Sequence, residues 1–577
     1  MESFGRDARF LGDGEVTVLK TDVRPGGYYD SIVLMQLQAA LADLPGVLDA
    51  GAVMATPENR ALLAASELLP GEDIEAGPTD LLIVVKAESE SAADEALSRV
   101  DSLLVRSGGA GGEDYRPRSL ESALKLLPEA RWALISVPGR FAGRVAGEAL
   151  DHGLHVFLYS DNVSLADEVA LKKRGAVEGR LVMGPDCGTA MINGIGLGFA
   201  NRVRRGAVGL VGASGTGLQA IFSHVHALGG GVSHAIGTGG RDLDAEVGAI
   251  TCRQGLDLLA RDSGTEVIVL VSKPPVPAVA RTVLRAARST GKPVVVHFVG
   301  FSPPARRLGS LYFATSLAEA AWMAVELSKS EGATGTPSPG AGEDESTPGY
   351  LRGLFSGGTL ASESLLALRS FLDPLHSNMK GDGVRSLETV SRSEAHTILD
   401  LGADEYTVGR LHPMIDNDMR VRRIAQEAAD PEVGLILLDV VLGDGAHPDP
   451  AGELAPAIAE ARRTRDLEFV VVVIGTDEDP QDLESQVETL IGAGALVFED
   501  LTNALSHVVD RLGGSFVPRE PQVDSDFLSA PVAAINIGLE SFAASLTDQG
   551  ARAIQVDWQP PAGGDDRLMA ILERMRR

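Results

Sequence analysis

Short apolar runs alternate with longer stretches of helical spacing along most of this 577-residue chain. Between residues 15 and 107, β-branched runs such as EVTVLKTDV and DLLIVVKA are separated by amphipathic segments such as AADEALSRVDSLLV. This alternation predicts a small open α/β sandwich. Beyond residue 114, apolar runs at 132–137, 155–159, 208–211 and 267–271 are again separated by predicted helices. Strands joined by helices form parallel sheets, so an α/β fold is expected throughout.

Two later segments carry the same succession of elements, and a linker separates them. Residues 350–517 follow the order of turns and strands in residues 206–330, which indicates a diverged second copy of a flavodoxin-like domain. Residues 331–349 are rich in Pro, Gly, Ser and Glu, with too few apolar residues to fold. We therefore predict an N-terminal α/β domain (1–107), a partial Rossmann-like domain (114–205), two flavodoxin-like domains (206–330 and 350–517), the linker (331–349) and a C-terminal α/β tail (530–577).

The composition of the chain indicates which classes of partner it can bind and in which cellular compartment we expect it. The formal net charge is −29, which argues against binding nucleic acid or an anionic membrane surface. Two cysteines, Cys187 and Cys252, are too few for a disulfide framework, so a reducing cytoplasm is expected. No apolar run in the sequence approaches the roughly 20 residues of a membrane-spanning helix. We expect a soluble, cytoplasmic protein.

Glycine-rich turns in the middle of the chain are candidates for binding an anion. One of them follows the strand at 208–211 and opens a predicted helix, whose N-terminus favours negative charge. A plain tight turn is the alternative for a motif of this kind. Cys187 is a candidate nucleophile, although a small residue packed beneath a loop is the favoured interpretation. The candidates are Gly184, Pro185, Asp186 and Cys187 in the first turn, Ser214, Gly215, Thr216 and Gly217 in the second, and Gly239 and Gly240 in the third.

The second copy carries residues suited to acid–base chemistry and to anion binding. Two histidines lie in loops where open α/β sheets bind ligands, each with an aspartate nearby in the sequence that could orient an imidazole. Two arginines could clamp a phosphate or carboxylate. The alternative is that the His-Pro pairs shape turns and the arginines are solvated; no HxH or HxxxH spacing indicates a metal. The candidates are His412, His447, Asp416 and Asp444 for catalysis, and Ser356, Gly357, Gly358, Thr359, Arg410 and Arg420 for phosphate or substrate binding.

The order of these motifs carries a family resemblance. A strand ending in ISVP, the turn GPDC, the turn ASGTG and the later turn GTGG resemble, in this order, the α-subunit of succinyl-CoA synthetase. LHPMID at 411–416, GDGAHPDP at 443–450 and the tail patterns NIGLESF and DWQPPAGG resemble the FdrA family, and this likeness spans nearly the whole chain. The resemblance implies a CoA-binding-type domain at 114–205 and two CoA-ligase domains, with residues 184–187 as the cofactor-binding turn.

The chain departs from the synthetase pattern at three places. The first Rossmann half, with its glycine-rich loop for coenzyme A, has no counterpart before residue 118. Where the family has a glutamate-bearing GEIGG loop, the chain reads SKPP at 272–275. The phosphohistidine loop expected after the strand at 294–299 is missing from the sequence, and His297 within that strand is expected to be a core residue. The groups that pass phosphate from a nucleotide are thus missing at these positions.

The FdrA resemblance implies a carbamoyltransferase. The implied reaction joins oxamate and carbamoyl phosphate to give oxalurate and phosphate, in allantoin breakdown, with partner subunits encoded nearby. The substrates would be small anions, and the reaction requires neither ATP nor coenzyme A. Two alternatives remain open. One is a nucleotide-dependent acyl-CoA ligase, which would bind coenzyme A or a nucleotide, and the other is a non-catalytic scaffold subunit.

Overall fold

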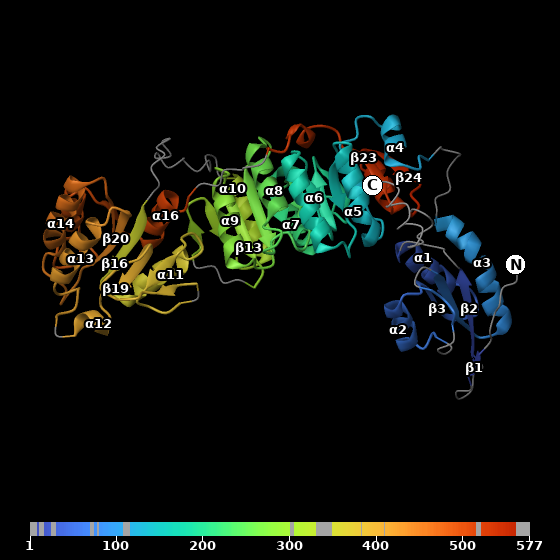
Figure 1. Ribbon diagram of the computed structural model, residues 1–577, viewed down its shortest axis with the longest axis horizontal. Coiled ribbons are helices and arrows are strands. Elements are labelled where there is room, and N and C mark those ends of the chain that lie inside the picture. Colours follow the sequence, from blue (N-terminus) through green and yellow to red (C-terminus); the bar gives the residue numbers. More distant parts are fainter. Residues whose placement is uncertain are drawn as a thin grey trace. The chain divides into compact units, whose positions relative to one another are not determined.

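Parallel sheets flanked by helices make up most of the chain, which confirms the expected α/β class (Figure 1). The computed structural model describes residues 8–10, 17–24, 31–69, 74–77, 80–107, 116–300, 305–329, 349–381, 383–408, 410–514 and 521–560. Nearly all of the predicted linker at 331–349 and the end of the predicted tail lie outside these residues. The chain divides into two units, residues 1–164 with 532–577 and residues 165–531. Among the described residues, no helix is long and apolar enough to cross a membrane.

The N-terminal domain is an antiparallel sheet in the order β1-β2-β4-β3. Its strand β4 reads LLIVVKA, and it is buried because β2 and β3 pair with its two edges and helices cover its face. Leu37 and Leu41 of α1 pack with Val100 of α3 in the same core. The elements are β1 (Ala8–Phe10), β2 (Thr17–Arg24), α1 (Ser31–Ala42), β3 (Val47–Met54), α2 (Pro57–Ala65), β4 (Leu81–Ala87) and α3 (Glu90–Ser107).

A parallel sheet in the same unit joins two segments that lie about four hundred residues apart in the sequence. Its strands follow the order β24-β23-β5-β6, and Ile537 of β23 pairs with Ile135 of β5. The segment expected as a compact tail of its own therefore supplies two strands to the sheet of residues 132–158. The elements are α4 (Leu120–Leu126), β5 (Trp132–Ile135), α5 (Gly139–Asp151), β6 (His155–Leu158), β23 (Ala533–Ile537), α17 (Glu540–Asp548) and β24 (Arg552–Val556).

The first sheet of the second unit has the order β14-β15-β13-β12-β10-β11-β8-β9. Its central strands β10, β12 and β13 are parallel, and α7 and α10 pack together over one face through Phe222 and Ala321. The elements are α6 (Leu165–Val177), β7 (Val182–Met183), β8 (Thr189–Ile192), β9 (Ile195–Gly198), β10 (Arg205–Gly212), α7 (Gly215–Ala227), β11 (Val232–Gly237), α8 (Ile250–Arg261), β12 (Val267–Ser272), α9 (Pro277–Arg288), β13 (Val294–Phe298), β14 (Arg307–Leu308), β15 (Leu311–Phe313) and α10 (Leu317–Lys329).

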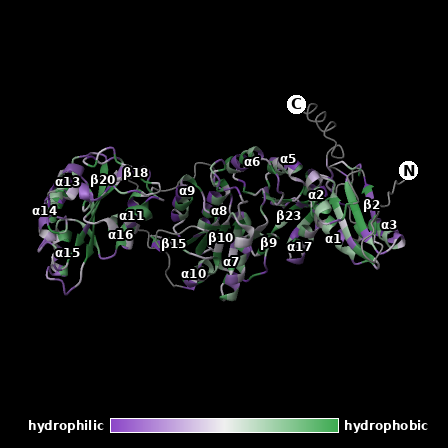
Figure 2. Ribbon diagram, turned by 90° about the horizontal axis from the view of Figure 1, so that it is seen from below, coloured by the Kyte–Doolittle hydropathy of each residue, from purple (hydrophilic) through white to green (hydrophobic). Residues whose placement is uncertain are grey.

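The second sheet of this unit repeats the central strand order of the first. Strands β19-β16-β20-β21 lie in the order of β11-β10-β12-β13, as expected for a diverged copy. Apolar residues concentrate in strands such as β20, whereas α13 carries many hydrophilic residues (Figure 2). The elements are β16 (Tyr350–Phe355), α11 (Gly358–Leu368), β17 (Leu375–Ser377), β18 (Arg385–Ser386), β19 (His396–Asp400), α12 (Asp404–Thr407), α13 (Asp418–Ala428), β20 (Val433–Val441), α14 (Pro450–Thr464), β21 (Glu468–Ile474), α15 (Leu483–Gly492), β22 (Leu496–Phe498), α16 (Leu501–Leu512) and the 3₁₀ turn η1 (Asp526–Leu528).

Substitution of Ile535 by alanine tests the role of β23 in the first unit. Ile535 is fully buried between its neighbours on β24 and β5. Ile535→Ala should lower the free energy of unfolding by about 2–5 kcal/mol, because it removes buried methyl groups and leaves a cavity. Ile491→Ala is the control, since this α15 side chain is 55% exposed. Urea unfolding checks the prediction, and equal losses in the two variants would contradict it.

Candidate functional site

Three glycine-rich turns meet at the carboxyl edge of the first sheet in the second unit. We call residues 184–187, 214–217 and 237–240 the three-turn site. A Cβ atom on Gly239 would lie 2.3 Å from the Pro185 carbonyl oxygen, and one on Gly237 would lie 2.2 Å from the carbonyl oxygen of Thr189. Gly239 also has a φ of +84°, which L side chains rarely adopt. The turns can approach this closely only because these positions are glycine.

Helix α7 begins inside the three-turn site. The Ser214 side chain caps it by accepting a hydrogen bond from the Gly217 N–H at 3.2 Å. The first N–H groups of a helix have no intrahelical acceptor, and here they belong to Gly215 and the exposed Thr216. Gly240 and Asp186 lie at the solvent side of the same edge. Small residues and a helix N-terminus at one place form a cradle suited to a phosphate group.

A buried ion cluster supports the third turn from beneath. The Lys172 ammonium donates to a carboxylate oxygen of Glu168 at 3.0 Å, to one of Asp242 at 2.8 Å, and to the carbonyl oxygen of Thr238 at 2.9 Å. All three ionised side chains are 0% exposed, and Arg241 pairs with the other Glu168 oxygen at 2.9 Å. The cluster therefore fixes the backbone of the turn that contains Gly239 and Gly240. Sequence reasoning missed it, because Lys172 and Glu168 look like an ordinary pair on a helix surface.

Cys187 is a packed residue within the three-turn site. Its thiol lies 2.5 Å from the position that a Cβ on Gly237 would take. Burial raises the pKa of the thiol to about 12, which leaves almost no thiolate at neutral pH. The structure therefore favours the packing role over the nucleophile. Together with Gly184 and Pro185, Cys187 forms the surface against which the third turn packs.

The corresponding edge of the second copy is held by a buried aspartate and arginine. Asp439 accepts hydrogen bonds from the Ser356 N–H at 2.7 Å and from the Ser356 hydroxyl at 2.6 Å. Arg420 donates to the same carboxylate at 3.0 Å and to the Asp439 carbonyl oxygen. Arg420 is only 2% exposed, so it supports the start of α11. The sequence led us to expect a clamp that faces solvent, and the structure does not place Arg420 in that role. The N–H and hydroxyl groups of Ser356 are both bound to Asp439, whereas Thr359 in the first turn of α11 is exposed.

An acidic residue occupies the N-terminus of α11. Asp400, at the end of β19, accepts from the Gly402 N–H at 2.9 Å, and its other oxygen lies 2.9 Å from where a Cβ on Gly358 would be. A Cβ on Gly402 would lie 2.7 Å from His412 Nε2, so the imidazole packs on the loop that holds Asp400. Burial raises the pKa of Asp400, and the Gly402 hydrogen bond and His412 only partly offset this rise. Asp400 and His412 thus both lie against Gly402, beside the N-terminus of α11.

The remaining candidates lie around the loops that follow β19 and β20. His447 Nε2 lies 3.2 Å from Glu453, and its Nδ1 accepts from the Asp449 N–H at 3.1 Å. Its partner is therefore Glu453, whereas the sequence suggested Asp444, which is exposed. The two histidine loops meet where the His447 N–H donates to the Met414 carbonyl oxygen at 2.8 Å.

Neither predicted aspartate orients a histidine in the described contacts. Asp416 accepts from the Asp418 N–H at 2.9 Å and so stabilises the start of α13. Arg410 is exposed beside the His412 loop, where it remains accessible to an anion. Asp400 and Asp439 were not among the sequence candidates, although both occupy the carboxyl ends of predicted strands, a position that could have identified them.

Three family models match separate segments of the chain. The model described as "CoA-ligase" matches residues 354–509, and "CoA binding domain" matches residues 203–300. The second match falls on the first flavodoxin-like segment, one domain later than the 114–205 expected from the sequence. The model described as "AllF, heavy metal-associated domain" matches residues 17–117.

A heavy-metal site does not fit the described residues of the matched N-terminal segment. Both cysteines lie outside residues 17–117, and both are buried. Thiolates are the ligands that soft metals prefer. Throughout the part of the chain that the structure describes, no group of three or more His, Cys, Asp or Glu side chains could hold a metal ion. We therefore assign no metal chemistry to this domain.

Among individual proteins, the chain is 42% identical over 498 residues to YahF of Escherichia coli strain K12, described as uncharacterized, covering 84% of this chain and 97% of that protein. It is 27% identical over 188 residues to the succinate–CoA ligase (ADP-forming) α-subunit of Aquifex aeolicus, covering 31% of this chain and 60% of that subunit. Among solved structures, the dinucleotide-forming acetyl-coenzyme A synthetase 1 of Ca. Korarchaeum cryptofilum is 17% identical with a TM-score of 0.29, covering 66% and 82% of the two chains. This structural likeness adds no argument of its own.

Substitution of Gly239 tests the close contact between the first and third turns. Gly239→Ala should destabilise the protein by more than the roughly 1–2 kcal/mol that a left-handed backbone costs an L residue, because the new methyl group meets the Pro185 carbonyl oxygen. Gly248→Ala is the matched control, since Gly248 has a φ of +72° and no atom within 4 Å of its would-be Cβ. Chemical denaturation measures both losses of stability. Equal losses would show that the contact is not tight.

Substitution of Asp400 tests the cost of its burial. Folding raises the pKa of the Asp400 carboxyl group, so this group stabilises the folded protein at pH values below its unfolded-state pKa of about 4. That stabilisation is lost as the pH rises through the pKa of the folded state. Asp400→Asn should therefore raise the unfolding midpoint at pH 7, and this gain should vanish near pH 4. Asp404→Asn, at an exposed position on α12, is the control. A midpoint at pH 7 that stays the same or falls would contradict the prediction.

Proposed function

The chain belongs to the FdrA family, within the CoA-ligase superfamily, and we propose that it transfers a phosphate-activated acyl group of the kind that acyl-CoA ligases handle. The observation that carries the proposal is the convergence of three turns around the N-terminus of α7. The N–H groups of Gly215 and Thr216 would bind the phosphate of an acyl phosphate or of coenzyme A. Donors fixed in this way stabilise charge that develops during group transfer.

The second copy carries a separate candidate for proton transfer. Asp400 and His412 lie at the N-terminus of α11, and Arg410 is exposed beside the same loop. Acyl transfer to a nitrogen, oxygen or sulfur nucleophile requires that the nucleophile lose a proton. A carboxyl group whose pKa is raised by burial accepts this proton more readily than an ordinary aspartate. His447, held by Glu453, is the second candidate for this role.

Two reactions of this class are candidates. The matches to the CoA-ligase and CoA-binding family models favour the first, an acyl-CoA ligase reaction. In that form, the three-turn site would take a phosphate group of coenzyme A or of the acyl phosphate. The residues present suit either, because the cradle consists of backbone donors and glycines that leave room for a phosphate. Coenzyme A would then be the acceptor: its thiol would form the thioester, the acyl–phosphate bond would break to release inorganic phosphate, and the thiol proton would pass to the acid–base group.

Two observations favour a second form, in which carbamoyl phosphate is the donor and oxamate the acceptor. His297 is buried within β13, and its Nδ1 lies 3.0 Å from the Ala314 carbonyl oxygen, so it is placed as a core residue. The loop after β12 carries Lys273 and prolines where the synthetases carry a glutamate. A donor that already holds its phosphate needs no phosphohistidine. Subunits encoded nearby would then complete the enzyme.

Two assays on the full chain, alone and co-expressed with its genomic neighbours, test the proposal. The first follows thioester formation from succinate, ATP and coenzyme A. The second follows phosphate release from carbamoyl phosphate that depends on oxamate. We expect activity in one of them, and Asp400→Asn or His412→Ala should lower it by about 10²–10⁴-fold because a general acid–base group is lost. His224→Ala, at an exposed position near the end of α7, should retain it.

The pattern of activities separates the candidate functions. Thioester formation without oxamate-dependent phosphate release supports the ligase, and the reverse supports the carbamoyltransferase. Inactivity in both assays, with and without the neighbouring subunits, would overturn the enzymatic proposal and leave the scaffold role. Full activity of both Asp400→Asn and His412→Ala would remove these two residues from the mechanism. The search for the acid–base group would then turn to His447.

A further inference from the structure

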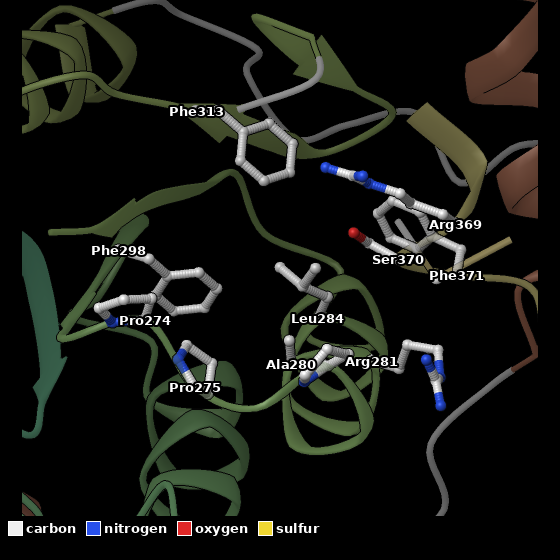
Figure 3. Close-up of a pocket in the computed structure, with 12 residues that line it drawn as sticks. Pro274, Pro275, Ala280, Arg281, Leu284, Phe298, Phe313, Arg369, Ser370 and Phe371 are labelled. Atoms are coloured by element: carbon white, nitrogen blue, oxygen red, sulfur yellow. The ribbon is translucent and has the colours of Figure 1, made fainter. Parts of the chain in front are cut away.

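A cavity of about 220 Å³ lies where the two flavodoxin-like domains of the second unit meet (Figure 3). The first domain builds most of the wall from the carboxyl edge of its sheet and from α9. Pro274 and Pro275 follow β12, Phe313 ends β15, and Leu284 lies on α9. The second domain adds Phe371, which follows α11. Most of the side chains that line the cavity are therefore apolar.

The charged groups that line the cavity are two arginines, and both already have partners. Arg281 pairs with Asp373 at 3.0 Å, and Figure 3 shows its guanidinium pointing away from the centre of the cavity. Arg369 has an interaction of its own as well. Among the lining residues that the structure describes, none is acidic. A charged ligand would lose its water here without meeting an available charge of opposite sign, so the cavity favours an uncharged ligand.

One neutral polar group is directed into the cavity. Figure 3 shows the Ser370 hydroxyl pointing towards the space between Phe313 and Leu284. A hydroxyl donates one hydrogen bond and can also accept, so it suits a hydroxyl group of a ligand in either role. The cavity thus offers a single neutral hydrogen-bonding group within a wall that is mainly apolar.

The volume of the cavity suits one ring with a small substituent. A dry apolar cavity of about 150 Å³ holds benzene, whereas pockets for drug-sized molecules span roughly 300–1,000 Å³. The cavity between the two domains, at about 220 Å³, lies between these sizes. An aromatic ring also packs favourably against aromatic side chains such as Phe313. Size and wall chemistry together favour a single-ring aromatic ligand.

Hydrogen bonds between the two domains hold the walls of the cavity in place. Arg285 of α9 donates to the Phe371 carbonyl oxygen at 3.1 Å. Arg288, one turn further along the same helix, donates to the carbonyl oxygens of Val509 and, at 2.6 Å, Gly514. The cavity is thus formed in advance, which lowers the entropic cost of binding a ligand.

We infer that this cavity binds a small uncharged phenol or aromatic alcohol, with its ring between Phe313 and Leu284 and its hydroxyl group on Ser370. Binding removes the apolar surfaces of the ring and of the wall from water. The hydrogen bond to Ser370 satisfies the one polar group that the ligand buries. This inference goes beyond the proposed reaction, because it requires binding and no turnover.

Calorimetric titration of the full chain with 4-methylphenol at pH 7 tests the inference directly. We expect one 4-methylphenol per chain, bound uncharged because a phenol titrates at about pH 10. 4-Methylbenzoate, which carries a carboxylate in place of the hydroxyl, should bind more weakly by about tenfold or more. Ser370→Ala should weaken the binding of 4-methylphenol about two- to tenfold and leave toluene, which lacks the hydroxyl, unaffected.

A larger residue at Ala280 tests where the ligand binds. Ala280 lies on α9 and lines the cavity (Figure 3). Ala280→Leu should fill the cavity, keep a good helix-forming residue and abolish the binding of both 4-methylphenol and toluene. Ala278→Leu makes the same change at an exposed position of the same helix and should retain both affinities.

Thermal unfolding of the two leucine variants separates loss of binding from loss of fold, and both should unfold close to the temperature of the original protein. Absence of 4-methylphenol binding by the original chain, equal binding of 4-methylbenzoate, unchanged affinity in Ser370→Ala, or retained binding in Ala280→Leu would each overturn the inference. Because the readout is binding alone, its failure is distinct from failure of the group-transfer proposal.

Discussion

The buried Lys172 ammonium is the interaction on which the three-turn site depends. It joins Glu168 of its own helix to Asp242 and to the Thr238 carbonyl oxygen, and Asp242 also accepts from the Cys252 N–H at 2.8 Å at the start of α8. Burying such charges is costly, and removing one partner is more costly still because it leaves an unpaired charge. Apolar residues could fill this volume, but they could not fix the carbonyl of Thr238. The cluster therefore specifies the position of a turn.

The two copies place different residues, a glycine and an aspartate, at equivalent positions of their sheets. In the first copy, Gly212 of β10 pairs with Gly237 of β11, and in the second, Phe355 of β16 pairs with Asp400 of β19. A glycine at this register position leaves the helix N-terminus open to an anion, whereas an aspartate places its own carboxylate there. The first copy is therefore suited to hold phosphate and the second to carry a proton. In the proposed reaction, the two domains would thus provide two different sites on one kind of fold.

The α/β class and the presence of glycine-rich turns between the strands and helices could be predicted, because the order of strands and glycines is local information. The place of Arg420 could not be predicted in the same way. An arginine on an amphipathic helix is usually solvated, and only the tertiary structure shows it facing Asp439. The pairing of β23 with β5 could not be predicted either, because a parallel contact between strands so distant in the chain leaves no local sequence pattern.

A net charge of −29 is compatible with the proposed phosphate site. Exposed charges are screened beyond roughly 8 Å at physiological ionic strength, so the acidic surface acts mainly on the approach of a substrate. At contact distance the backbone N–H groups at the start of α7 would determine the affinity of the proposed phosphate site. An acidic surface of this kind slows association with an anion without weakening the bound state to the same degree. The selectivity of the proposed phosphate site would therefore rest on local donors.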